Sequence, residues 1–219
     1  VTIFVGVGLS MLIAAPIGAA ASQVGTLIMW ATEQAPLVMG VLVSVIVGVA
    51  LTLPISSAAI CAALGLTGLA GGAAVAGCCA QMIGFAVMSY RENGVGGLVS
   101  QGLGTSMLQM GNIIKNPRIW IAPTLASAIT GPLATCVFHF EMNGAAVSSG
   151  MGTCGLVGQI GVYTGWVNDI AAGTKAAITP MDWAAMVLLC FVLPAVLSVV
   201  FCEIERKLGW IKDGDLKLN

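Results

Sequence analysis

The residues best suited to chemistry lie together in the stretch Phe138-His139-Phe140-Glu141-Met142-Asn143. His139 is the only histidine of the chain, and Glu141 is the only charged residue between Arg118 and Asp169. A carboxylate accepts hydrogen bonds from hydroxyl groups, and a histidine donates one or carries a proton near neutral pH. We therefore expect a site for a small polar solute here. The alternative is that both side chains are solvated at an interface or cap a helix.

A glycine-rich polar phrase occurs twice, and its second copy begins inside that stretch. NGVGGLVSQGLGTS runs from Asn93 to Ser106, and NGAAVSSGMGTC runs from Asn143 to Cys154. Each copy follows a glutamate, Glu92 in one case and Glu141 in the other. The spacing differs slightly between the copies, so the internal repeat is weak. Glycine is costly inside a helix and leaves backbone groups accessible, so neither copy is expected to form a regular span.

The composition of the chain indicates whether these residues lie in a water-soluble protein or in a membrane protein. Hydrophobic residues make up 58% of the chain and charged residues 8%, and the mean hydropathy is +1.01. This leaves too little polar surface for a water-soluble domain. No charged residue precedes Glu33, and none lies between Glu33 and Arg91, which predicts a membrane protein. The net charge of -1 argues against a general nucleic-acid surface, so no nucleic-acid partner is expected.

Irregular backbone survives at membrane depth only where protein encloses it or where it lines a wet cavity. We therefore predict two re-entrant hairpins that meet near the bilayer centre and face one cavity, as broken helices do in secondary transporters. The alternative is that the glycines are the small faces of closely packed helices. The residues expected to bind the solute are Glu92, Asn93, Gln101, Thr105, His139, Glu141, Asn143, Gly150, Gly152 and Thr153.

The elements around these residues are expected to be helices, which makes the chain an all-α polytopic membrane protein. Prolines 123, 132 and 194 are expected to bend the spanning helices. Apolar segments are expected at Val1–Ala15 (interrupted at Pro16 and Gly18), Leu37–Leu53, Ile55–Leu66, Leu69–Tyr90, Ile119–Phe138 and Trp183–Cys202. Because the chain begins at once with apolar residues, we expect further membrane segments upstream rather than a signal peptide.

The charged ends of these segments suggest an orientation and a domain division. Residues 1-202 are expected to form the transmembrane domain, and residues 203-219 a short tail. Arg206, Lys207, Lys212 and Lys217 follow the last span, which places the C-terminus in the cytoplasm by the positive-inside rule. Lys115-Asn116-Pro117-Arg118 is interpreted as a turn with charges that set topology, while Arg91-Glu92 fits either an interfacial turn or a site.

Other chemistries find little support in the sequence. The seven cysteines include no C-x-x-C pair and no His/Cys cluster, so free buried thiols are expected, with no metal site and no cofactor. The chain shows no nucleophile-base constellation, which makes an enzyme with a self-contained site the least favoured class.

Several longer motifs resemble a known family over nearly the whole chain. They are LPISSAA at 53-59, GCCAQMIGFA at 77-86, RENG at 91-94, QGLGTS at 101-106, KNPRIW at 115-120 and GWIK at 209-212. In these motifs the chain resembles the EIIC-type membrane family of the bacterial phosphotransferase system, in the branch that includes the perfringolysin regulator. The chain has no soluble IIB-type domain with a phosphorylatable cysteine and no IIA-type histidine, so phosphotransfer by this chain alone is not implied.

The resemblance implies a homodimeric permease-like protein of the bacterial inner membrane. Such a protein binds a small polar solute, a sugar in the simplest case, and moves it across the bilayer with soluble IIB and IIA proteins as partners. The alternative function is a membrane sensor or regulator that keeps the permease fold without transport.

Overall fold

The computed structural model describes residues 2–218, and the side chains of residues 18–218. Helices dominate this part of the chain, and its only extended pairing is an isolated antiparallel bridge between Gly68 and Met142, so the all-α prediction is confirmed. The α-helices are α1 (Thr2–Gln34), α2 (Pro36–Thr52), α3 (Ser57–Leu64), α4 (Gly68–Met88), α5 (Tyr90–Val99), α6 (Met110–Lys115), α7 (Ile121–Pro132), α8 (Val157–Ala171), α9 (Pro180–Val187) and α10 (Leu193–Lys207).

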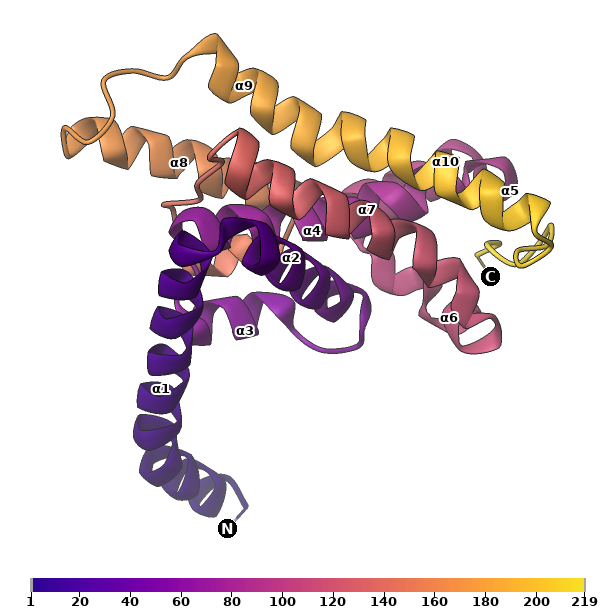
Figure 1. The fold of residues 1–219 in the computed structure, drawn as a ribbon. Helices are drawn as coiled ribbons and strands as arrows, with labels where there is room; N and C mark the ends of the chain where they lie inside the picture. The colour runs from indigo at the N-terminus through magenta and orange to yellow at the C-terminus, as the bar shows by residue number, and fades with distance from the viewer. Residues whose placement is uncertain (1, 219) are drawn as a thin grey trace.

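Helix α4 is the centre of the molecule, with α2, α7 and α10 packed around it (Figure 1). Its sequence GLAGGAAVAGCCAQMIGFAVM consists largely of small residues, and nearly all of them are buried. Small side chains let helix backbones approach closely, which gains dispersion contacts where lipid supplies no hydrophobic drive. At Gly77 the approach leaves no space for a Cβ, because the Ser44 carbonyl of α2 occupies it.

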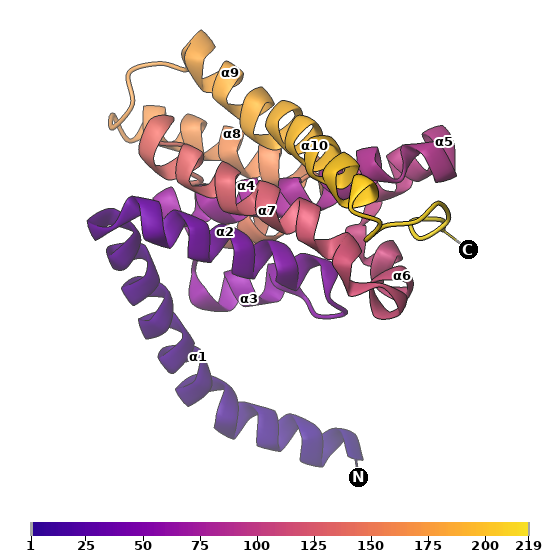
Figure 2. The ribbon, with the colours of Figure 1, turned by 45° about the vertical axis from the view of Figure 1, so that its right-hand side comes forward.

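Three stretches of the described chain are long and apolar enough to cross a membrane: Gly68–Met88, Pro117–Val137 and Pro180–Lys207. Wider π-helical turns at 133–137 and 188–192 lie next to Pro132 and Pro194, where bends were predicted, whereas α7 continues past Pro123. The predicted interruption at Pro16 and Gly18 is wrong, because α1 is one helix that bends and leaves the bundle (Figure 2). A single proline removes one helical hydrogen bond, which bends a helix without always ending it.

The first glycine-rich copy lies in a hairpin of residues 90–115, here called the first hairpin. Helix α5 enters, the π-helical turn Ser100–Gly104 and the extended residue Thr105 reverse the chain, and α6 returns. Both arms of the first hairpin reach the C-terminal residues, because Asn93 donates to the Leu216 carbonyl and Asn112 to the Lys217 carbonyl. This hairpin therefore opens at the end of the molecule that holds the tail, residues 208–218, which we call the tail end (Figure 1).

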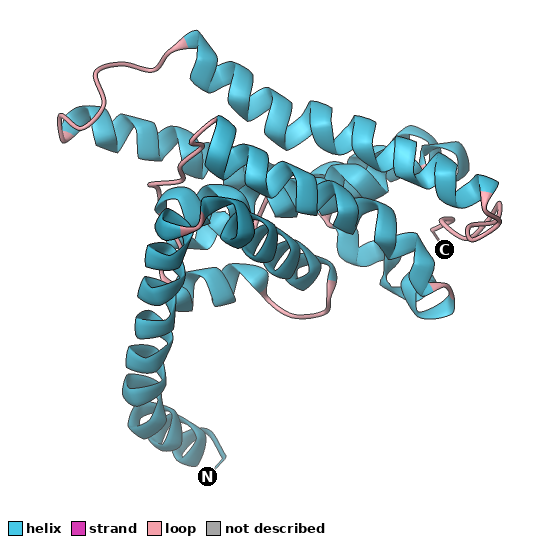
Figure 3. Ribbon diagram, viewed as in Figure 1, coloured by secondary structure: helices cyan, strands magenta, loops and turns pink. Residues whose placement is uncertain are grey.

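The second copy lies in a hairpin of residues 140–171, the second hairpin, which opens at the opposite end. Its first arm pairs with the beginning of α4 through the Gly68–Met142 bridge, and α8 is its returning arm. Since α4 has 21 residues, the open ends of the two hairpins, which we call their mouths, are separated by about 30 Å. The long loop that joins α8 to α9 stands at this second end, which we call the cavity end (Figure 3).

The tips of the two hairpins touch each other, with the Thr153 hydroxyl donating to the Gly102 carbonyl at 2.5 Å. Thr153 also lies against Met82, and a Cβ on Gly102 would contact Ile83 and Ala86, so the tips meet beside the last third of α4. The expected meeting near the bilayer centre stays a prediction. The second hairpin is long and the first is short, because α8 runs for 15 residues and α6 for only six.

The cysteine prediction holds for five of the seven residues. Cys61, Cys78, Cys79, Cys190 and Cys202 are free and buried. Cys136 is also free but exposed, and Cys154 is half-buried.

We expect Gly77→Ala to destabilise the protein strongly, because the added methyl group would overlap a backbone carbonyl that no side-chain rotation can move. Overpacking of this kind costs about 1–3 kcal/mol or more. Gly111→Ala is the control, since a Cβ there meets nothing within 4 Å and alanine favours a helix by about 0.4–1 kcal/mol. Thermal unfolding in detergent measures both variants, and equal stability of the two would contradict the close packing.

Candidate functional site

A cavity of about 580 Å³ lies at the cavity end, enclosed by the segment after α7, by α8, by the α8–α9 loop and by α9. Three of the predicted site residues line it: His139, Glu141 and Asn143. The other lining residues are Val137, Phe138, Phe140, Trp166, Asp169, Thr174, Lys175, Met181, Asp182 and Ala185. The cavity therefore combines charged groups with aromatic and aliphatic surface, as binding sites for small molecules commonly do.

The chain reversal after α7 places the first group of these residues. The π-helical turn 133–137 ends the helix, and the Phe140 amide then donates to the Ala134 carbonyl at 2.8 Å. Between them His139 adopts a φ of 44°, a left-handed conformation that is uncommon for a residue other than glycine. As a result, Phe140 points into the core, while His139 and Glu141 are exposed. Gly72 of α4 makes room for the Phe140 carbonyl, which a Cβ would strike.

Asn143 connects the two carboxylates of the cavity. Its Oδ1 accepts a hydrogen bond from the backbone amide of Gly68 at 3.1 Å. The NH₂ group of the Asn143 side chain therefore points away from Gly68. Nδ2 then donates to Glu141 Oε2 at 3.0 Å and to Asp169 Oδ2 at 2.9 Å. The partner of Glu141 is thus Asn143, and no hydrogen bond joins Glu141 to His139 in the described residues. Asn143 fixes both carboxylates at the mouth of the second hairpin.

A second polar group in the cavity is the ion pair of Lys175 and Asp182, whose Nζ and Oδ1 atoms are 2.8 Å apart. Asp182 also caps α9, because its Oδ2 accepts from the amide of Thr179 at 2.7 Å, and the Thr179 hydroxyl completes the capping box. The Lys175 ammonium lies 5.6 Å from the centre of the Trp166 ring, within the range of a cation–π interaction. Trp166 in turn meets Trp183 edge to face.

Asp169, Lys175, Asp182 and Trp166 were not among the residues selected from the sequence. The available signal was that these three charged residues interrupt an otherwise uncharged chain between Glu141 and Glu203. Their assembly with Glu141 depends on the second hairpin returning along α8, and no spacing rule gives that distance. The arrangement offers carboxylate acceptors, an ammonium donor and a ring face, which suits binding of a polar solute and supplies no nucleophile with an adjacent base.

The glycine-rich tip residues lie apart from this cavity and hold the hairpins to the bundle. The Gly150 carbonyl accepts from the Ser57 hydroxyl at 2.7 Å, and Gly152 lies against the backbone of Cys78 in α4. Thr153 bonds to the first hairpin, as described above. Gln101 and Thr105 form hydrogen bonds within the first hairpin and to Ser89, just before it. Gln101 donates to Ser89 at 2.7 Å and accepts from Gln109 at 2.9 Å, and Thr105 accepts from the amide of Met107.

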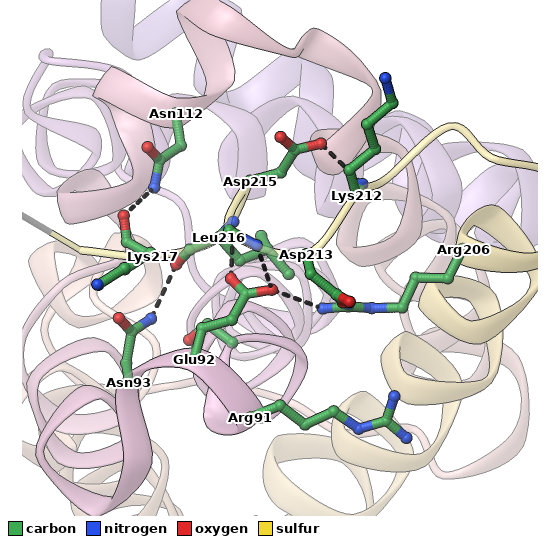
Figure 4. Close-up of polar contacts among 12 residues, drawn as sticks. Arg91, Glu92, Asn93, Asn112, Arg206, Lys212, Asp213, Asp215, Leu216 and Lys217 are labelled. Atoms are coloured by element: carbon green, nitrogen blue, oxygen red, sulfur yellow. Dashed lines mark hydrogen bonds and ion pairs between the residues drawn. The ribbon is translucent and has the colours of Figure 1, made fainter.

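Glu92 and Asn93, at the mouth of the first hairpin, bind the chain's own tail (Figure 4). Glu92 forms an ion pair with Arg206 at 3.0 Å, and its carboxylate accepts from the amides of Gly214 and Leu216. Asn93 donates to the Leu216 carbonyl and accepts from the Leu218 amide, both at 2.8 Å. The ten predicted residues therefore do not surround one common cavity in the described chain, and the tail fills the space at Glu92 and Asn93.

The charges of the two ends differ in sign. Seven of the eight lysine and arginine residues belong to the tail end, where Arg91 pairs with Glu203 and Arg118 lies over Trp210. Lys175 is the one basic residue at the cavity end, beside the acidic residues Glu141, Asp169 and Asp182. The cavity thus carries a net negative charge, and the tail end a net positive charge.

The helical fold, the apolar stretches and this charge distribution define an all-α membrane protein with a solute-sized cavity at one end. A family model described as "Phosphotransferase system, EIIC" matches residues 1–218. The chain therefore belongs to the EIIC family of the phosphotransferase system and is a permease-like membrane component of that system. Neither a curated protein nor a solved structure matches the chain.

Asn143→Asp is expected to destabilise the protein near neutral pH, because it replaces the donor shared by Glu141 and Asp169 with a third carboxylate. The loss should be about 1–3 kcal/mol, as for other unsatisfied partly buried groups. The difference from the unsubstituted protein should shrink at low pH, where the carboxyl introduced at position 143 is neutral. Asn168→Asp, which adds the same charge at the neighbouring exposed position, is the control. Unfolding curves that coincide for the two variants across pH would contradict the role of Asn143.

Glu92→Gln is expected to release the tail, because the pair with Arg206 is largely shielded from water and organises two backbone amides. We expect trypsin to cleave at Lys212 and Lys217 at least about tenfold faster, which corresponds to about 1.4 kcal/mol of easier local opening. Glu203→Gln is the matched control, since its pair with Arg91 is exposed and should contribute little. Unchanged cleavage of the Glu92 variant would show that the tail is held by other contacts.

Proposed function

We propose that the chain binds a small polar solute, a sugar in the simplest case, in the cavity at its cavity end and moves it across the bacterial inner membrane. The observation that carries this proposal is the position of the cavity: it lies at the mouth of a glycine-rich hairpin whose tip meets a second hairpin from the opposite end. Broken elements that meet in this way are the usual sites of solute passage in secondary transporters.

The tip contact is the barrier in this proposal. It includes the Thr153–Gly102 hydrogen bond and the packing of small residues around it, and it would separate the cavity from the tail end. Both groups belong to irregular segments, which are tolerated in a bilayer only where protein or a wet passage surrounds them. Alternate opening on the two sides of this contact would let a solute pass without an open pore. The hairpins are thus re-entrant elements in the proposed mechanism.

The charge distribution supports an orientation with the tail end in the cytoplasm. Basic residues close to membrane segments favour the cytoplasmic side, and seven of eight lie at this end. The cavity then faces outward and receives the solute, whereas the soluble IIB and IIA proteins would meet the tail end. Exposed apolar side chains on α2 and α10, such as Ile46 and Val196, suit contact with lipid or with a second copy in a homodimer.

A second candidate function is that of a membrane sensor. The tail is fastened to the first hairpin by Glu92 and Asn93, so a movement of the hairpin tips would reach the cytoplasmic tail through one continuous element. In this function solute binding would alter the tail without net passage of the solute. Uptake and signalling assays on the same variants separate the two functions.

The transport function is tested by uptake of labelled sugars into cells that express the chain without Cys136 and Cys154, the two cysteines that are not buried. Thr174→Cys places a thiol in the cavity wall, and Lys217→Cys places one in the tail. An external, membrane-impermeant thiol reagent should block uptake through the Thr174 variant by at least about tenfold and leave the Lys217 variant active. Labelling of Lys217→Cys alone would reverse the proposed orientation. A transcriptional response without uptake of any sugar would favour the sensor.

A further inference from the structure

The two mouths of the internal repeat carry the same residue types but differ in what occupies them. At the first mouth, Glu92 and Asn93 are engaged by the Arg206 guanidinium and by backbone groups of the tail. At the second mouth, Glu141 and Asn143 face the cavity, and no segment of the described chain lies on them as the tail lies on the first pair. The first mouth therefore shows which chemistry satisfies this pair of residue types: a cation that also donates hydrogen bonds.

The second mouth has two carboxylates, Glu141 and Asp169, and the cation of its cavity, Lys175, is paired with Asp182. Glu141 Oε2 and Asp169 Oδ2 each accept from the same Asn143 nitrogen, at 3.0 and 2.9 Å, so these two oxygens are at most about 5.9 Å apart. Neither carboxylate forms an ion pair within the described residues, since Lys175 is bound to Asp182. Two carboxylates held so close by a neutral amide favour the binding of a positive charge between them.

The remaining acceptor positions are available to a ligand. An ionised carboxylate has about four lone-pair sites, and Asn143 occupies one on each of Glu141 and Asp169. A primary ammonium offers three donors together with its charge. The cavity already holds one such group, the Lys175 ammonium, on a carboxylate and beside the Trp166 ring. Its walls thus provide the partners that an ammonium requires.

We propose that the solute of this cavity carries a primary ammonium group on a hydroxylated skeleton, as an amino sugar does, and that Glu141 and Asp169 bind the ammonium. The proposal rests on the proposed function, because it names the class of solute for the same site. The skeleton would lie against Phe138 and Met181, with its hydroxyls near His139 and Thr174. A neutral sugar could donate hydroxyl hydrogen bonds to the carboxylates but would lack the ion pair, and a sugar phosphate would be repelled.

The proposal is tested with three sugars that share the glucose ring and differ in charge: glucosamine, glucose and glucose 6-phosphate. Their binding to the purified full chain is measured by calorimetry and by thermal stabilisation, at a pH where the amine is protonated. We expect glucosamine to bind at least about tenfold more tightly than glucose, and glucose 6-phosphate to bind most weakly. Glu141→Gln and Asp169→Asn should each reduce glucosamine binding to the level of glucose.

The control variant is Glu33→Gln, which removes an exposed carboxylate from the end of α1 near the same end of the molecule and should leave the preference unchanged. Absence of glucosamine binding overturns the proposal. Equal binding of glucose and glucosamine, lost from both in Glu141→Gln, overturns the amine preference and leaves the proposed function standing. If sugar binding is the same in both cavity variants as in the unsubstituted protein, the amine proposal and the proposed function are both contradicted. Calcium alone is tested in parallel, and stabilisation by calcium through Glu141 and Asp169 without glucosamine binding would replace the proposal by a metal site.

Discussion

The close approach of helices to α4 is the constraint on which the rest of the structure depends. In lipid, helix association draws on contact area and interhelical hydrogen bonds, so a central helix of glycine and alanine lets several neighbours come near at once. Gly77 against Ser44 of α2 and Gly84 against Ser198 of α10 show this packing at two levels along α4. Because α4 is surrounded, its two ends become the fixed points from which the hairpins start and to which they return.

This packing also explains why the charged groups lie at the mouths of the hairpins and not at their tips. A tip that lies against α4 has its polar atoms satisfied by neighbouring backbone, as Ser57 does for Gly150, and it has little space for a ligand. A mouth lies where α4 ends and the bundle widens, and there side chains of several elements meet. The charged residues of the second mouth come from the reversal after α7, from α8 and from α9. None of these elements could be moved without losing contact with the bundle.

The sequence predicted the helical membrane fold, and it drew attention to Glu141 and Asn143, which line the cavity, because rare charged residues and a repeated glycine phrase are visible without coordinates. It did not predict the division of the ten residues among cavity, tips and tail. That division depends on the unequal lengths of the hairpins, since α8 has 15 residues and α6 has six. Asp169 and Lys175 are 28 and 34 positions beyond Glu141, and only the returning helix brings them to it. The tail contact with Glu92 was equally hidden, since it joins residues more than a hundred positions apart.

The opposite charges of the two ends give the proposed solute class a direction of movement. In the proposed orientation, an ammonium-bearing solute first meets a negative cavity, where it is concentrated by long-range attraction. The membrane potential then favours its passage inward by about 2.3 kcal/mol per charge for each 100 mV. The Thr153–Gly102 contact between the ends joins a hydroxyl and a carbonyl, which are both neutral, so the positive charge meets neither a trap nor a fixed repelling charge in this pair. The basic residues repel the positively charged solute only at the tail end. A group that neutralises the charge of the solute would therefore have to act there.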